Sequence, residues 1–257
     1  MTGIEVWTLL RRFTDARIGL GRSGAGLPTR EVLKFSMAHA QARDAVTAAI
    51  DWAPVETALA GLGLESVRIE SAVADRDTYL RRPDLGRRLS AASRERLAPH
   101  LGARPDLLIV VGDGLSSKAV AANASATIAA LLPSTRRHGW KLGPVLLASQ
   151  ARVALGDEAG EFLCARSVLI LIGERPGLSS PDSLGAYITF APKVGRKDAE
   201  RNCISNIRAG GLSYDEAAFK MAWLLKEAFR RGLTGVDLKD ESNYQLDGPR
   251  EAARLPG

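Results

Sequence analysis

The chain has 257 residues, of which 46% are hydrophobic and 25% charged, and it carries a formal net charge of +6 at pH 7. This composition is typical of a soluble globular protein, and its longest apolar runs, about five or six residues, are far shorter than the roughly 20 that a membrane-spanning helix needs. Four Trp, four Tyr and six Phe do not interleave with basic residues as a nucleic-acid stacking platform requires. The sequence therefore predicts neither a membrane protein nor a nucleic-acid binder.

The cysteines and histidines are scattered along the chain. Cys164 and Cys203 form no CxxC pair, and His39, His100 and His138 lie far from each other in sequence. This spacing predicts no zinc or iron–sulfur site within the chain. The N-terminal segment lacks the long apolar stretch of a secretion signal, so we expect a cytoplasmic protein.

The first third of the chain is expected to be mainly helical. Apolar residues recur with helical spacing from about residue 30 to 50, and Pro54 begins a short helix that ends at Ala60. A brief strand over residues 66–69 leads into a polar stretch at residues 74–79. We therefore expect a small helical N-terminal domain over residues 1–76 and a second domain over residues 77–257.

In the second domain, predicted helices and strands alternate. Apolar runs predict strands over residues 107–111, 145–148, 168–172 and 186–190. Helices are expected over residues 81–96, 118–132, 158–164 and 213–232. Pro133 either interrupts the second of these helices or starts another. Strands that alternate with helices form parallel sheets covered on both faces, so the sequence predicts an α/β fold with a parallel sheet.

The strand over residues 107–111 leads into a glycine-containing loop, Gly112-Asp113-Gly114-Leu115-Ser116. Ligands of α/β sheets bind at the carboxyl ends of strands, and glycine lets the backbone approach a ligand closely. Ser116 or Ser117 can cap the following helix. We therefore take Asp113, Gly114 and Ser116 as candidate binding residues, with a tight strand-to-helix turn as the alternative.

A second loop of this kind follows residues 168–172, with the sequence Gly173-Glu174-Arg175-Pro176-Gly177. The Glu174 carboxylate can accept hydrogen bonds from ligand amides, or it can pair with Arg175 in an exposed ion pair. The sequence alone leaves both interpretations open. Together the two loops predict a pocket for a large polar ligand.

Other motifs carry weaker signals. The glycines of residues 19–24 match GxGxxG, but no buried strand precedes them, so a turn-rich loop is expected. Cys203 lies in a polar segment expected to be a loop, and without a nearby histidine it is interpreted as a packing or contact group. Four arginines between residues 81 and 88 form either a solvated basic face or an interface or phosphate anchor: Arg81, Arg82, Arg87 and Arg88.

Six segments, taken together, resemble the small (light) subunit of ethanolamine ammonia-lyase. They span residues 16–30, 39–45 (HAQARDA), 79–89 (YLRRPDLGRRL), 113–116 (DGLS), 173–178 (GERPGL) and 202–207 (NCISNI). Each motif alone is weak, but their order along most of the chain makes the resemblance specific.

The resemblance implies an adenosylcobalamin-dependent enzyme that converts ethanolamine to acetaldehyde and ammonia. It implies a Rossmann-like domain after the helical N-terminal domain, and a large subunit whose TIM barrel holds the substrate, with cobalamin between the two subunits. Family contacts to the coenzyme match Val153, Glu174 and Cys203. The DxHxxG motif of base-off proteins is absent, as a base-on enzyme requires. No catalytic residue is expected in this chain, because the coenzyme supplies the radical chemistry.

The sequence differs from the family in two places, and two alternative functions are also considered. Residues 146–151 lack an aromatic and a glycine found in some relatives, which affects the detail of the Val153 contact. Enteric relatives carry a longer N-terminal extension, so we expect the bacterial cytoplasm and leave encapsulation in a microcompartment open. The rivals are an autonomous nucleotide-dependent α/β enzyme and a basic scaffold protein.

Overall fold

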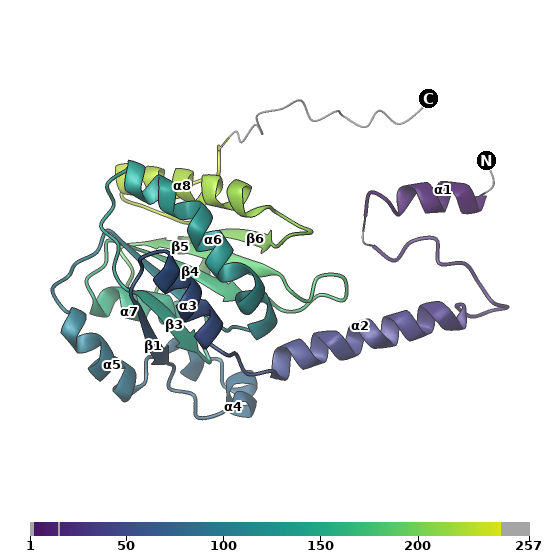
Figure 1. Ribbon diagram of the computed structural model, residues 1–257, viewed down its shortest axis with the longest axis horizontal. Coiled ribbons are helices and arrows are strands. Elements are labelled where there is room, and N and C mark those ends of the chain that lie inside the picture. Colours follow the sequence, from purple (N-terminus) through teal and green to yellow (C-terminus); the bar gives the residue numbers. More distant parts are fainter. Residues whose placement is uncertain (1–2, 15, 243–257) are drawn as a thin grey trace.

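The computed structural model describes residues 3–14 and 16–242, and it is an α/β structure built on one six-stranded sheet (Figure 1). The strands are β1 (Ser66–Glu70), β2 (Leu107–Gly112), β3 (Val145–Ser149), β4 (Ser167–Gly173), β5 (Leu184–Phe190) and β6 (Asn202–Ile207). Their order in the sheet is β1-β3-β2-β4-β5-β6. The four strands predicted over residues 107–190 and the one predicted at 66–69 are confirmed.

Only part of the sheet is parallel. Strands β1 to β4 run parallel to one another, whereas β5 is antiparallel to β4 and β6 is antiparallel to β5. The predicted parallel sheet is therefore confirmed for β1 to β4, whereas β5 and β6 depart from it. A parallel pairing needs a crossover of about a dozen or more residues, usually helical, and the segment 174–183 between β4 and β5 contains no helix.

The helices cover both faces of the sheet. The long helices are α2 (Thr29–Thr47), α6 (Ser117–Arg137) and α8 (Tyr214–Arg231). The short ones are α1 (Gly3–Leu10), α3 (Ala53–Gly61), α4 (Arg76–Arg81), α5 (Ala91–Leu97) and α7 (Ala154–Phe162), and the 3-10 turns are η1 (Leu85–Arg87), η2 (Ala98–His100) and η3 (Asp198–Glu200). Helices α3, α6 and α8 pack on one face, and α5 and α7 on the other. None of the helices in the described part of the chain combines the length and apolar character that crossing a membrane requires.

Each face of the sheet has its own apolar core because alternate residues of a strand point to opposite sides. In β2, Ile109 and Val111 pack with α6 and α8, whereas Leu108 and Val110 pack with α7. The last helix ends as its sequence predicts: Ser213 and Glu216 form a capping box, and Gly232 ends the helix at φ 73°.

Three predicted elements differ from the structure. The helix expected over residues 81–96 is interrupted, because the chain is extended at Arg88 and Ser90 caps a new helix, α5. Helix α6 continues through Pro133, whose ring lies on the exposed side of the helix, where the missing backbone N–H disturbs little. Helix α7 begins at Ala154, earlier than the predicted residue 158.

Residues N-terminal to the expected domain boundary contribute to the same layered unit. Strand β1 pairs with β3 along its whole length, and α3 packs in the core with α6. Helix α2 extends away from this unit, with α1 beyond it (Figure 1). The boundary near residue 76 stays a prediction, and its second domain includes residues 243–257, which lie outside the described residues.

Candidate functional site

The two glycine-rich loops lie against each other at the carboxyl ends of β2 and β4. The Leu115 backbone N–H donates a hydrogen bond to the Gly173 carbonyl at 2.9 Å. A Cβ atom at Gly173 would overlap the Ser116 carbonyl and lie 2.7 Å from the Asp113 carbonyl oxygen. Glycine is therefore required at this position because two backbone segments touch there, leaving no room for a ligand between them.

Asp113 is buried where β2 and β3 separate. Its carboxylate accepts hydrogen bonds from the backbone N–H groups of Gln150 at 2.9 Å and Ala151 at 3.0 Å. The guanidinium of Arg76 lies 3.6 Å away. Burial raises the pKa of Asp113, and the two backbone donors and Arg76 oppose that rise. The side chain thereby holds the turn between β3 and α7.

Ser116 and Gly114 also hold the loop in place. The Ser116 hydroxyl accepts a hydrogen bond from the Ala119 N–H, which confirms the predicted helix cap, and it donates to the Pro181 carbonyl at 2.8 Å. Gly114 has φ +56°, and its carbonyl accepts a hydrogen bond from Arg76. The Ser116 contacts tie α6 to the β4–β5 loop, and the Arg76 contact ties the loop before α6 to α4.

Two arginines lie close to the ring of Tyr79 beside this loop. The guanidinium carbons of Arg76 and Arg152 lie 4.4 and 4.1 Å from the ring centroid. The Tyr79 hydroxyl donates to the Ala151 carbonyl at 2.9 Å, and burial raises its pKa to about 12. This stack fixes the direction of the chain into α7 and so determines where Arg152 and Val153 lie.

Val153 and Glu174 line one pocket of about 400 Å³. Val153 is the residue before α7, and Glu174 follows β4. The pocket is formed by Leu115, Arg152, Val153, Ile172, Gly173, Glu174, Arg175 and Tyr187. The structure thus brings together two predicted binding residues, whereas Asp113, Gly114 and Ser116 are not among those lining this pocket.

Glu174 is held by its neighbours with part of its carboxylate still available. Its Oε2 accepts hydrogen bonds from the Ser183 hydroxyl and, at 3.3 Å, from the Asn206 N–H. Gly185 leaves room for this side chain, because a Cβ there would lie 2.9 Å from Oε1. No ion pair joins Glu174 to Arg175 in the described part of the chain, so the exposed-pair alternative is not the observed arrangement.

Cys203 lies beside the pocket. The residue is exposed in β6 and pairs across the sheet with Tyr187, which lines the pocket. Burial and the neighbouring Cys203 raise the pKa of Tyr187. The Cys203 sulfur also lies 3.4 Å from the Ser205 hydroxyl.

The loop expected around Cys203, over residues 201–206, is wrong, because residues 202–207 form strand β6. Only Ile204 and Ile207 are buried in it, and a register shift interrupts its pairing with β5. This three-residue spacing hides the two-residue alternation by which strands are recognised. The GxGxxG segment, by contrast, lies as expected between α1 and α2, and no strand precedes it among the residues that the structure describes.

Sequence reasoning did not single out Arg152 and Tyr187 as pocket residues. Arg152 could have been found, since it follows β3 closely and so lies at the ligand-binding edge of the sheet. Tyr187 could not, because its place in the pocket depends on the antiparallel pairing of β5.

These features define an α/β protein whose pocket lies where the parallel strands β2, β3 and β4 end. The model of the ethanolamine ammonia-lyase light chain (EutC) family matches residues 4–239. The chain therefore belongs to the ethanolamine ammonia-lyase light chain family.

Relatives agree with this assignment over nearly their whole length. A protein of Bradyrhizobium diazoefficiens is 59% identical over 235 residues, covering 91% of this chain and 90% of the relative. One of Xanthomonas campestris pv. campestris is 55% identical over 254 residues, covering 97% and 93%. One of Rhodopseudomonas palustris is 54% identical over 248 residues, covering 96% and 95%. All three are named ethanolamine ammonia-lyase small subunit.

Proposed function

We propose that the chain is the small subunit of an adenosylcobalamin-dependent ethanolamine ammonia-lyase, which converts ethanolamine to acetaldehyde and ammonia. It completes the cobalamin site at the interface with a large subunit that holds the substrate. One observation carries the proposal: Val153 and Glu174 line the same pocket, and Cys203 pairs with Tyr187 of that pocket. These residues are distant in sequence, and the family resemblance assigns all three to the coenzyme.

The pocket residues fit one edge of a corrin. The rim of a corrin carries amide arms, whose N–H groups are donors for the Glu174 carboxylate. Val153 offers an apolar surface, and Cys203 is exposed beside it. Pockets for drug-sized ligands have about 300 to 1,000 Å³, so the 400 Å³ here holds only a part of the much larger cobalamin. The remainder needs a second surface, which favours a site shared with a partner.

The chain's own residues bind and orient in this proposal. When bound, adenosylcobalamin supplies the radical chemistry. Glu174 accepts amide hydrogen bonds, while Val153 excludes water from one edge of the site. Asp113, Gly114 and Ser116 act by holding the loops that carry these residues.

The proposal also covers the class of fold and the location. Helices on both faces of the sheet, and strands β2 and β3 whose following helices lie on opposite faces, support a Rossmann-like arrangement. We place the protein in the bacterial cytoplasm, with encapsulation in a microcompartment as the open alternative.

The chain alone is expected to release no acetaldehyde from ethanolamine, because the proposal puts the substrate on the large subunit. Both subunits are purified separately, mixed with adenosylcobalamin, and assayed for acetaldehyde. Activity is expected only in the mixture, where the two chains also elute together in gel filtration. Turnover by this chain alone would contradict the proposal.

Glu174→Ala is expected to weaken coenzyme binding by about tenfold, since hydrogen bonds to a charged acceptor contribute about 1.5 to 3 kcal/mol. The KM for ethanolamine changes little, because the substrate lies on the large subunit. Corrin absorbance after equilibrium dialysis of the two-subunit complex gives the affinity. Glu95→Ala, which removes an exposed carboxylate of α5 outside the pocket, is the matched control. An unchanged affinity in Glu174→Ala removes this residue from the site.

A further inference from the structure

A second cleft, of about 610 Å³, adjoins the pocket of Glu174. Three segments line it: residues 83–88 around η1, residues 152–154 at the start of α7, and residues around 194–201 before and within η3. Arg152 and Val153 line both hollows. A ligand larger than either one can therefore extend from the pocket into the cleft.

The cleft is strongly basic. Its lining includes six cationic side chains and two carboxylates. Both carboxylates are already paired: Asp84 accepts from Arg82 at 2.8 Å, and Asp198 accepts from Arg201 at 2.8 Å. Arg87 and Lys197 also line the cleft, and neither forms an ion pair within the residues that the structure describes. Two positive charges are thus available to an anion.

Further donors around the cleft have no partner. The Nε atoms of Arg152 and Arg201 are buried without a hydrogen bond, and the Arg201 side chain is only 2% exposed. Buried polar atoms without a partner are uncommon, and an ion or ordered water is one of the explanations for them. Helix α7 begins at this cleft without a side-chain cap, so its positive end adds to the attraction for an anion.

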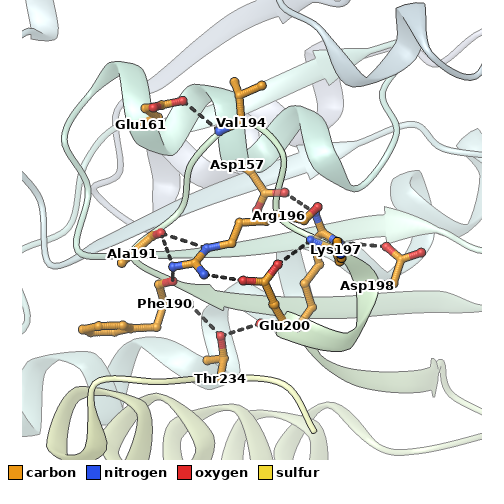
Figure 2. A network of polar contacts seen from close by, with 11 residues as sticks. Asp157, Glu161, Phe190, Ala191, Val194, Arg196, Lys197, Asp198, Glu200 and Thr234 are labelled. Carbon is orange, nitrogen blue, oxygen red and sulfur yellow. Dashed lines mark hydrogen bonds and ion pairs between the residues drawn. The ribbon is translucent and has the colours of Figure 1, made fainter. Parts of the chain in front are cut away.

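The segment that carries Lys197 is held in place before any ligand arrives (Figure 2). The guanidinium of Arg196 binds Glu200 and donates to the Ala191 carbonyl at 2.9 Å. The Lys197 N–H donates to Glu200 at 2.7 Å, and the Val194 N–H donates to Glu161 of α7 at 2.8 Å. Binding therefore carries little cost for ordering this wall of the cleft.

We propose that this cleft binds a phosphate group, and that the phosphate is the phosphodiester of the coenzyme's nucleotide arm. The inference rests on the proposed function and extends it to a second part of the same ligand. It also divides the arginine cluster predicted from the sequence: Arg87 and Arg88 line the cleft, whereas Arg81 and Arg82 do not.

The test compares three corrinoids on the complex of both subunits. Cyanocobalamin has the phosphate and the base, cobinamide phosphate has the phosphate alone, and cobinamide has neither. The double variant Arg87→Gln/Lys197→Gln is expected to bind the first two about tenfold or more weakly and cobinamide as the wild type does. Arg81→Gln, an exposed arginine of the same segment outside the cleft, should leave all three affinities unchanged.

Affinities come from equilibrium dialysis and corrin absorbance, and gel filtration checks that the subunits still associate. Inorganic phosphate in the dialysis buffer should compete with cyanocobalamin and not with cobinamide. Equal losses for all three corrinoids, no loss for any, or a loss of subunit association in the double variant would each overturn the phosphate site. Failure of the wild-type complex to bind any corrinoid would instead overturn the proposed function.

Discussion

Asp113→Asn is expected to lower the free energy of unfolding by about 3 to 5 kcal/mol, as is typical when one partner of a buried charged pair is removed. Both carboxylate oxygens accept backbone N–H groups, from Gln150 and Ala151, and Arg76 lies close by. An asparagine has only one acceptor oxygen, so its NH₂ group would face one of these N–H donors. The partly buried guanidinium of Arg76 would also lose the charge of Asp113 beside it.

Urea unfolding of the purified chain measures the free energy, and thermal unfolding should show a fall in melting temperature of roughly 6 to 20 °C for a domain of this size. Asp44→Asn is the control, because this aspartate has the same chemistry but a side chain that is 74% exposed in α2. Its unfolding curve should overlay that of the wild type. A loss below about 1 kcal/mol in Asp113→Asn would show that the carboxyl group is not held as an ionised acceptor.

Gly173→Ala is expected to lower the free energy of unfolding by about 3 kcal/mol or more, the upper part of the range for overpacked sites. The new methyl group would overlap the Ser116 carbonyl and crowd the Asp113 carbonyl, and both are backbone atoms that cannot turn aside. Relief of the overlap requires the two glycine-rich loops to separate. Because Gly173 also lines the pocket of Glu174, coenzyme binding by the two-subunit complex should weaken as well.

Gly61→Ala provides the matched control for this overlap. Gly61 ends α3, and a Cβ there meets nothing within 4 Å. Alanine should be neutral or stabilise the chain by up to about 1 kcal/mol, because it favours helix. If both glycine variants unfold like the wild type, the close packing of the two loops is not required for the fold.

Local sequence patterns were sufficient for most individual elements. The apolar runs of β2 and β4 predicted strands because a strand covered on both faces carries no polar residues. The capping box of Ser213 marked the start of α8, and Gly232 marked its end. Both signals are local, because each involves backbone groups within one turn of the chain. The ordered family motifs identified the family without any structural information.

Long-range contacts were decided only by the tertiary structure. The sequence of β6 gave no clear alternation, because a register shift places its two buried isoleucines three residues apart. Asp113 was predicted to contact a ligand, and its carboxylate accepts hydrogen bonds from residues 150 and 151. These residues lie next to Asp113 only because β3 pairs with β2 in the sheet.

The pocket, too, depends partly on local sequence and partly on long-range contacts. The amino-acid sequence by itself determined the strand ends, the glycine-rich loops and the residues that the family assigns to the coenzyme. Only the tertiary structure placed Val153 and Glu174 in one pocket, with Cys203 beside it and a basic cleft adjoining it. The physical reason is that local spacing determines helices, strands and caps, whereas the order and direction of strands determine which distant side chains meet.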